Sequence, residues 1–180
     1  MNGISAEPIR TARLDLLPLR VEHAEEMAGV LADPALHEFI GGAPETAEEL
    51  RARYERLTAG APEPGVSWLN WVVRLREEGH LVGTVQATVL DAELHAEVAW
   101  VVGTPWQGRG IAGEAARGLV EWLGGVSVRT VVAHVHPDHA ASAAVARGAG
   151  LVATGEWQEG EMRWVRKTRS VRRRAGVTLP

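Results

Sequence analysis

The spacing of apolar residues changes along the first third of the chain, and each change marks a predicted strand or helix. Arg13–Leu19 is apolar with partial alternation, which predicts a strand. In Val21–Ala32 the apolar residues recur at helical spacing, so a helix is predicted there, ended by the Asp-Pro pair that follows. Thr46 with Glu49 three residues later is a capping box, which predicts a second helix that reaches about Ala59.

The middle of the chain is rich in extended runs. Three such runs are Trp68–Arg76, Leu81–Leu90 and His95–Val102. Only a few residues join each run to the next, whereas a parallel crossover needs a dozen or more. We therefore predict three antiparallel strands joined by hairpins.

Helices and strands alternate in the last third. Gly110–Leu123 and His139–Ala149 have the apolar spacing of helices, Thr130–His136 is a valine-rich strand, and Leu151–Glu159 with Met162–Thr168 forms a hairpin. The predicted fold class is α+β, a mixed α/β arrangement. Its centre is a mostly antiparallel twisted sheet of about seven strands, flanked by about four helices.

Composition agrees with one globular domain, which we place at residues 1–170. The chain has 180 residues, of which 46% are hydrophobic, and no cysteine, so disulfides and thiolate metal sites are excluded. The first residues lack the pattern of a signal peptide, and no run of 18 apolar residues exists. We expect a cytoplasmic protein with no membrane partner, as a monomer or a homodimer.

Charge is distributed unevenly along the chain. Seven of the 19 basic residues follow Met162, and no acidic residue does. Residues 171–180 are interpreted as a disordered basic tail, and one short cluster without interleaved aromatics is poor evidence for a nucleic-acid partner. The acidic remainder would attract a cationic amine, although ordinary solubility charge explains it equally well.

Gly108, Gly110 and Gly113 have the spacing G-x-G-x-x-G, which alone suggests a dinucleotide-binding turn. That fold needs the motif on its first strand-helix unit, followed by several parallel strands. Here the motif follows three antiparallel strands, and no Gly-Lys-Ser/Thr follows it, so neither a nicotinamide site nor a Walker loop is predicted. A helix start that merely needs glycine is the plain structural alternative.

The wider pattern identifies a family. Val102, four residues and then QGRGIA (107–112) resembles the acetyl-CoA-binding motif of the GNAT acetyltransferase superfamily. Small residues let a ligand approach the backbone, and the free N–H groups at a helix start bind pyrophosphate. The resemblance implies that acetyl-CoA is the cosubstrate, with no metal, and that these residues contact it: Trp100, Val101, Val102, Gln107, Gly108, Arg109, Gly110, Ile111, Ala112, His139 and Ser142.

The resemblance covers nearly the whole chain. RTARLDLLPLR, AEVAWVV and VHPDHAASAAVARGAGL look like segments of the branch that contains the ribosomal-protein N-terminal acetyltransferases. Two positions depart from that branch, because His139 replaces an Asn that helps to fix the CoA arm and Leu151 replaces a Phe. A histidine at that position can still donate a hydrogen bond.

HVHPDH (134–139) also resembles the first metal-ligand segment of the metallo-β-lactamase superfamily. Such a site needs further His and Asp ligands downstream, and none follows His139. A zinc metallohydrolase is therefore kept as a distant alternative, and ordinary strand histidines are the plain one.

The GNAT resemblance implies transfer of an acetyl group to a primary amine by direct attack on the thioester. Glu97 is the candidate base, with a water relay and a solvent-facing strand glutamate as alternatives. A backbone N–H near Val101 or Val102 would stabilise the oxyanion. Ser142 is the candidate donor of a proton or hydrogen bond to the leaving thiolate, unless it is only a helix-start hydroxyl. It is preferred for this role to the single tyrosine, Tyr54, which is far from the motif in sequence.

The amine acceptor is less specified, and a protein N-terminus and a small-molecule amine both remain open. His37, Glu38 and Phe39 are expected to line its site, and Trp68 and Trp71 to lie either in the core or in the pocket wall. An acyl-CoA-binding protein without catalytic activity is the alternative function.

Overall fold

The computed structural model describes residues 3–92 and 94–168. Within them the strands form a single sheet in the order β1-β2-β3-β4-β5-β6-β8-β7. The strands are β1 (Ile9–Arg10), β2 (Leu14–Pro18), β3 (Val66–Leu75), β4 (His80–Leu90), β5 (His95–Val102), β6 (Thr130–Val135), β7 (Val152–Gln158) and β8 (Glu161–Lys167). Neighbours are antiparallel except β5 and β6. The basic tail predicted at 171–180 lies outside the described residues.

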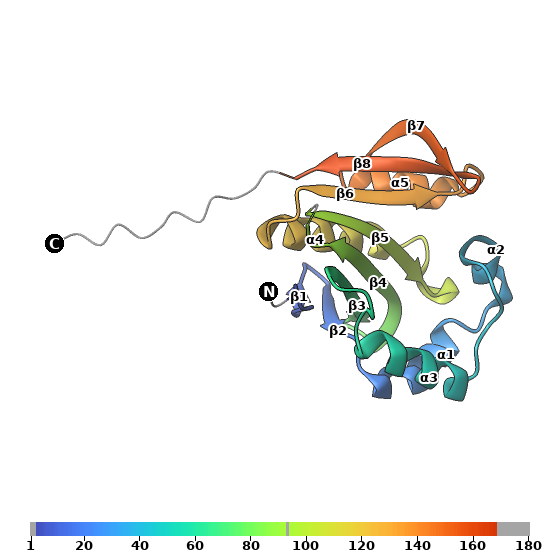
Figure 1. Cartoon of the computed structure of the whole chain (residues 1–180). Coiled ribbons are helices and arrows are strands. Elements are labelled where there is room, and N and C mark those ends of the chain that lie inside the picture. Colours follow the sequence, from blue (N-terminus) through green and yellow to red (C-terminus); the bar gives the residue numbers. More distant parts are fainter. Residues whose placement is uncertain (1–2, 93, 169–180) are drawn as a thin grey trace.

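Helices cover both faces of the sheet (Figure 1). They are α1 (Ala24–Val30), α2 (His37–Ile40), α3 (Ala47–Thr58), α4 (Ile111–Gly125) and α5 (Ala140–Gly148). Alternation along β3 divides the core, because Trp71 and Val73 pack with α4 and α5 while Val72 packs with α1 and α3. No helix of the described residues is both long enough and apolar enough to cross a membrane.

The parallel pair β5 and β6 is joined by α4, as the length of a parallel crossover requires. Their paired residues end at Glu97 and Val132, although β5 continues to Val102. The two strands therefore separate within the sheet, and Figure 1 shows β6, β8 and β7 diverging from β5. This separation positions the site described below.

The predicted fold class is confirmed, with eight strands rather than about seven and five helices rather than about four. The additional elements are short, namely the two-residue β1 and the four-residue α2. One boundary was wrong, because α4 continues through Gly124 and Gly125 instead of ending before them. A glycine costs a helix only about 1 kcal/mol, which the burial of Leu123 in this last turn offsets.

Candidate active site

The glycine motif lies where β5 ends and α4 begins. Gly108 and Gly110 have φ values of 75° and 76°, a left-handed conformation that favours glycine, and Gly110 is the N-cap of α4. The N–H groups of residues 111–113 have no acceptor in the described part of the chain. Gln107 fixes the loop, because its Nε2 donates to the Val102 carbonyl oxygen at 3.0 Å. The result is a helix start whose free donors suit an anion.

Two arginines adjoin this helix start. Arg13 donates from Nη1 to the Arg109 carbonyl oxygen at 2.9 Å and pairs with Glu114 at 3.1 Å. Arg109, the predicted phosphate contact, pairs with Glu78 at 2.9 Å. Hydrogen bonds from Trp106 and Arg109 lower the pKa of the Glu78 carboxyl below its usual range. Arg13 is thus a second cation at the motif, and no sequence motif identified it.

Within the described residues, the edge of β5 beyond Glu97 has no strand partner on its β6 side. The Gly103 N–H donates to the Val82 carbonyl oxygen on β4 at 2.8 Å. Because backbone groups alternate along a strand, the N–H groups of Trp100 and Val102 point to the β6 side and that of Val101 points to β4. Of the two expected oxyanion donors, Val102 has the suitable direction.

A pocket of about 600 Å³ lies between the two halves of the sheet. One wall comes from the α2 region, α3 and β3–β5, and the other from β6, α5 and the start of β8. It brings together these predicted residues: Glu97, Trp100, Val101, His139 and Ser142. Val102 and residues 107–112 do not line it, so the helix start is a neighbouring feature beyond the end of β5.

Glu97 and His134 form a pair on adjacent strands. Glu97 points to the face opposite Val98 and Trp100, as alternation predicted, and its side chain is 57% exposed. His134 Nδ1 lies 3.2 Å from Glu97 Oε1. The His134 side chain is only 12% exposed, and its Nε2 is buried without a partner among the described residues. The candidate base therefore has a neighbour that sequence reasoning did not assign to it.

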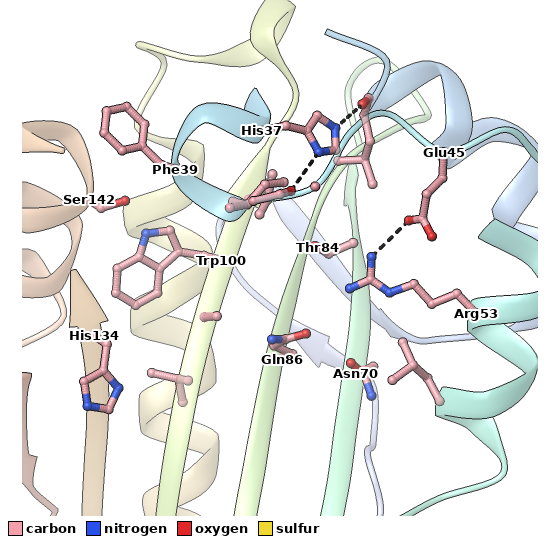
Figure 2. A pocket seen from close by; sticks show the side chains of 18 of the residues that line it. His37, Phe39, Glu45, Arg53, Asn70, Thr84, Gln86, Trp100, His134 and Ser142 are labelled. Carbon is pink, nitrogen blue, oxygen red and sulfur yellow. Dashed lines mark hydrogen bonds and ion pairs between the residues drawn. The ribbon is translucent and has the colours of Figure 1, made fainter. Parts of the chain in front are cut away.

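Ser142 projects from the first turn of α5 into the pocket, on the side of Trp100 (Figure 2). Its hydroxyl makes no hydrogen bond within residues 3–92 and 94–168, and the helix start has no side-chain cap. The alternative interpretation, a hydroxyl that satisfies the helix start, has no supporting contact. Ser142 is free to bond a ligand.

The histidines of HVHPDH have separate contacts. His139 stacks on Phe39 with ring centroids 4.2 Å apart, and the His136 ring lies 5.5 Å from the same phenyl ring. Burial, with the charge of His136, lowers the pKa of His139. No three His, Asp or Glu side chains of the described residues are grouped as metal ligands. The His139 ring stacks on Phe39 of α2 and makes no capping hydrogen bond to α5, and its contact with the CoA arm stays a prediction.

Two of the three residues expected at the acceptor site lie in the wall of this pocket. His37 and Phe39 line the pocket and Glu38 does not. The His37 ring is held between the carbonyl oxygens of Leu31 and Gly41, at 3.1 and 3.2 Å. Trp71 is a fully buried core residue whose position also borders the pocket, whereas Trp68 lines a separate hollow beside the N-terminal segment.

Several polar pocket residues were missed. Tyr54 is buried with its hydroxyl unpartnered among the described residues, and burial raises its pKa to about 12. Arg53 pairs with Glu45 at 3.0 Å above Asn70 and Gln86, which are register partners on β3 and β4 (Figure 2). Asn70 interrupts the apolar run WLNWVV, and this interruption is the signal that could have revealed the pocket floor.

Comparisons with known proteins identify the family. Residues 13–152 match the family model described as "Acetyltransferase (GNAT) domain". This range includes HVHPDH, so that segment belongs to the acetyltransferase match and not to a metallo-β-lactamase. A search of curated protein sequences returned no significant match.

Three solved structures share the fold. A GNAT-family acetyltransferase from Bacillus anthracis has a TM-score of 0.77 and 19% identity, covering 90% of this chain and 99% of its own. Ribosomal-protein-S5-alanine acetyltransferase from Vibrio fischeri has a TM-score of 0.77 and 16% identity, covering 91% of this chain and 97% of its own. Spermidine N-acetyltransferase from Vibrio cholerae, in complex with CoA and spermine, has a TM-score of 0.72 and 15% identity, covering 89% of this chain and 98% of its own. The chain belongs to the GNAT acetyltransferase family.

Proposed function

We propose that this protein is an N-acetyltransferase that moves the acetyl group of acetyl-CoA to a primary amine by direct attack. The observation that carries the proposal is the separation of β5 from β6. It leaves an unpaired strand edge next to the free donors of α4, with Glu97 and Ser142 on one adjoining pocket. The Vibrio cholerae structure, which contains CoA and an amine, supports this assignment by its shared fold.

The residues at the start of α4 fit a CoA pyrophosphate. Backbone N–H groups of residues 111–113 would donate to it, and Gly108 and Gly110 keep side chains away from the backbone there. Arg13 lies close enough to add charge, because a Cβ on Gly110 would be 3.5 Å from its Nη2. Arg109 can do so in addition to its bond with Glu78. Bound acetyl-CoA supplies an activated acetyl group as a thioester.

Three protein groups divide the chemistry in this proposal. Glu97 accepts a proton from the ammonium form of the acceptor, which gives the amine its nucleophilic lone pair. As the C–N bond forms and the C–S bond breaks, the N–H of Val102 stabilises charge on the carbonyl oxygen. Ser142 donates its hydrogen bond to the departing sulfur. The second amine proton passes to solvent, and the released thiolate takes a proton from solvent, so the products are an amide and a thiol.

The acceptor class is an amine that carries a positive charge before it reacts. Among the described residues, three carboxylates line the pocket, from Glu45, Glu97 and Glu161, and Arg53 is the one arginine that does, paired with Glu45. The Vibrio relatives named above act on a ribosomal protein and on spermidine, so a protein N-terminus and a small polyamine both belong in the test.

A thiol-release assay with acetyl-CoA and a panel of amines tests the proposal. The panel contains N-terminal peptides, polyamines and aminoglycosides. We expect release that depends on both acetyl-CoA and one class of amine. Tight CoA binding without thiol release for any amine would instead identify an inactive acyl-CoA-binding protein.

A further inference from the structure

His134 makes its contact with Glu97 through the parallel register of β5 and β6. Glu97 pairs with Val132, so His134, two residues further along β6, lies on the same face. Its Nδ1 is 3.2 Å from Glu97 Oε1, and both residues line the pocket. The contact therefore lies at the point where the two strands separate.

The surroundings of the two His134 ring nitrogens determine which nitrogen carries the proton. An ionised carboxylate only accepts, so Nδ1 of His134 must donate to Glu97. Nε2 is buried and has no partner in the described part of the chain. A proton there would be buried without an acceptor, which is costly. In the neutral ring the single proton therefore belongs on Nδ1.

Within the described residues, the other charged groups near His134 make no ion pair with it, and two of them have partners of their own. Register places Arg163 of β8 opposite His134, and the Arg163 guanidinium donates to Glu156 of β7 at 2.7 Å. Glu161 lines the pocket two residues before Arg163 on β8, and His136, on the His134 side of the pocket, contacts Asp138. Among the described residues, Glu97 has the one carboxylate within 4 Å of a His134 ring nitrogen.

We infer that His134 is a positioning residue for the base. It holds Oε1 of Glu97 through the Nδ1–H group, and Oε2, which has no partner among the described residues, is left to accept the proton of the amine. Without this bond a glutamate that is 57% exposed would sample several rotamers, and few of them would meet the amine. The inference rests on the proposed function of Glu97.

Amide substitutions separate positioning from direct proton transfer. In His134→Asn the side-chain N–H group lies near the position of Nδ1–H, whereas in His134→Gln it lies near Nε2. We expect His134→Ala and His134→Gln to lower kcat about tenfold near neutral pH, and His134→Asn to remain within about threefold of the wild type. If imidazole itself were the base, the Asn variant would be as slow as the Ala variant, and the inference would be overturned.

A pH profile excludes a merely structural role. The loss of kcat in His134→Ala relative to the wild type should shrink as pH rises, because free amine then becomes abundant and the base matters less. A deficit that is constant with pH, accompanied by a lower unfolding temperature, would contradict positioning.

The tautomer can be read without any acceptor, from ¹⁵N chemical shifts of the His134 ring in the full chain. We expect the proton on Nδ1 in the wild type and loss of that preference in Glu97→Ala. A proton on Nε2 in an active wild type overturns the positioning role alone. A wild type that acetylates no amine overturns the proposed function, and the catalytic part of this inference with it, whatever the tautomer.

Discussion

At the scale of single residues, Ser142 and Glu97 differ in how their oxygen atoms are hydrogen-bonded. The Ser142 hydroxyl has no hydrogen-bond partner within the described residues, and the Glu97 carboxylate has one oxygen bonded and one open. Both line one pocket, Glu97 from the wall that contains β5 and Ser142 from the wall that contains α5. Their proposed tasks differ in timing, because Glu97 acts on the amine before attack and Ser142 acts on sulfur as it departs.

Ser142→Ala should lower turnover more than CoA affinity, since its hydrogen bond strengthens as charge develops on sulfur. A bond to a charged group contributes about 1.5–3 kcal/mol, so kcat should fall roughly ten- to hundredfold. Steady-state kinetics with titration calorimetry of CoA measures both quantities. Unchanged turnover at every pH would assign the thiolate to water instead.

Glu97→Gln should be slow near neutral pH and recover as pH rises, because the amine then loses its proton to solvent without a base. The glutamine keeps an acceptor oxygen for His134, so the fold should be unaffected. A pH–rate profile beside that of Ser142→Ala checks this, since the serine variant should not recover. A Glu97→Gln profile parallel to the wild type would remove Glu97 from the mechanism.

At the scale of elements, the start of α4 concentrates free donors, and two of its glycines are left-handed. Gly110→Asp should weaken CoA binding at least about tenfold, or about 1.4 kcal/mol, because its carboxylate would occupy the anion site and attract Arg13. Gly60→Asp is the matched control, because Gly60 also has a positive φ (88°) but follows α3. Calorimetry showing equal CoA affinity in both variants would contradict the assignment.

A second element-scale feature ties α4 to the turn before β2. Glu114 accepts hydrogen bonds from Thr11 at 2.8 Å and from Arg13 at 3.1 Å. Burial alone would raise the pKa of the Glu114 carboxyl, but these bonds and the charge of Arg13 lower it overall. Because the pKa of Glu114 is lower in the folded state than in the unfolded state, its ionised carboxylate stabilises the fold. This stabilisation is complete above the unfolded-state pKa and is lost as pH falls through the folded-state pKa.

Glu114→Gln should therefore reduce the free energy of unfolding at neutral pH, and the difference from wild type should vanish in acid. Urea denaturation across pH measures this difference, with Glu121→Gln, an exposed position on the same helix, as control. A difference that stays constant down to strongly acidic pH would show that the charge of Glu114 contributes nothing.

Elements built from local signals could be predicted, and contacts between distant strands could not. The apolar spacing of α4 and the capping box at Thr46 are local, and both are confirmed. The bond between Glu97 and His134 depends on a register set across the whole of α4. The stacking of Phe39 on His139 likewise joins segments a hundred residues apart. The glycine motif was found because its requirement is a local backbone conformation.

At the scale of the whole molecule, the sheet consists of two halves that share only a short parallel pairing. The first half, β1–β5, holds α1 and α3, and the second, β6, β8 and β7, holds α5 on the face that α4 also covers. The order β6-β8-β7 was not predicted, because a hairpin can add to a sheet through either of its strands. This arrangement leaves a pocket between the two halves, where we propose that the acceptor amine meets acetyl-CoA.

The most direct test of acetyl transfer is mass spectrometry of the acceptor amine after incubation with acetyl-CoA. The account predicts one added acetyl group per modified amine, with CoA thiol released in equal amount. It also predicts that Glu97→Gln with Ser142→Ala forms this product far more slowly near neutral pH while still binding CoA. Product formed as fast by the double variant, or no acetylated amine from a wild type that binds CoA tightly, would contradict the account.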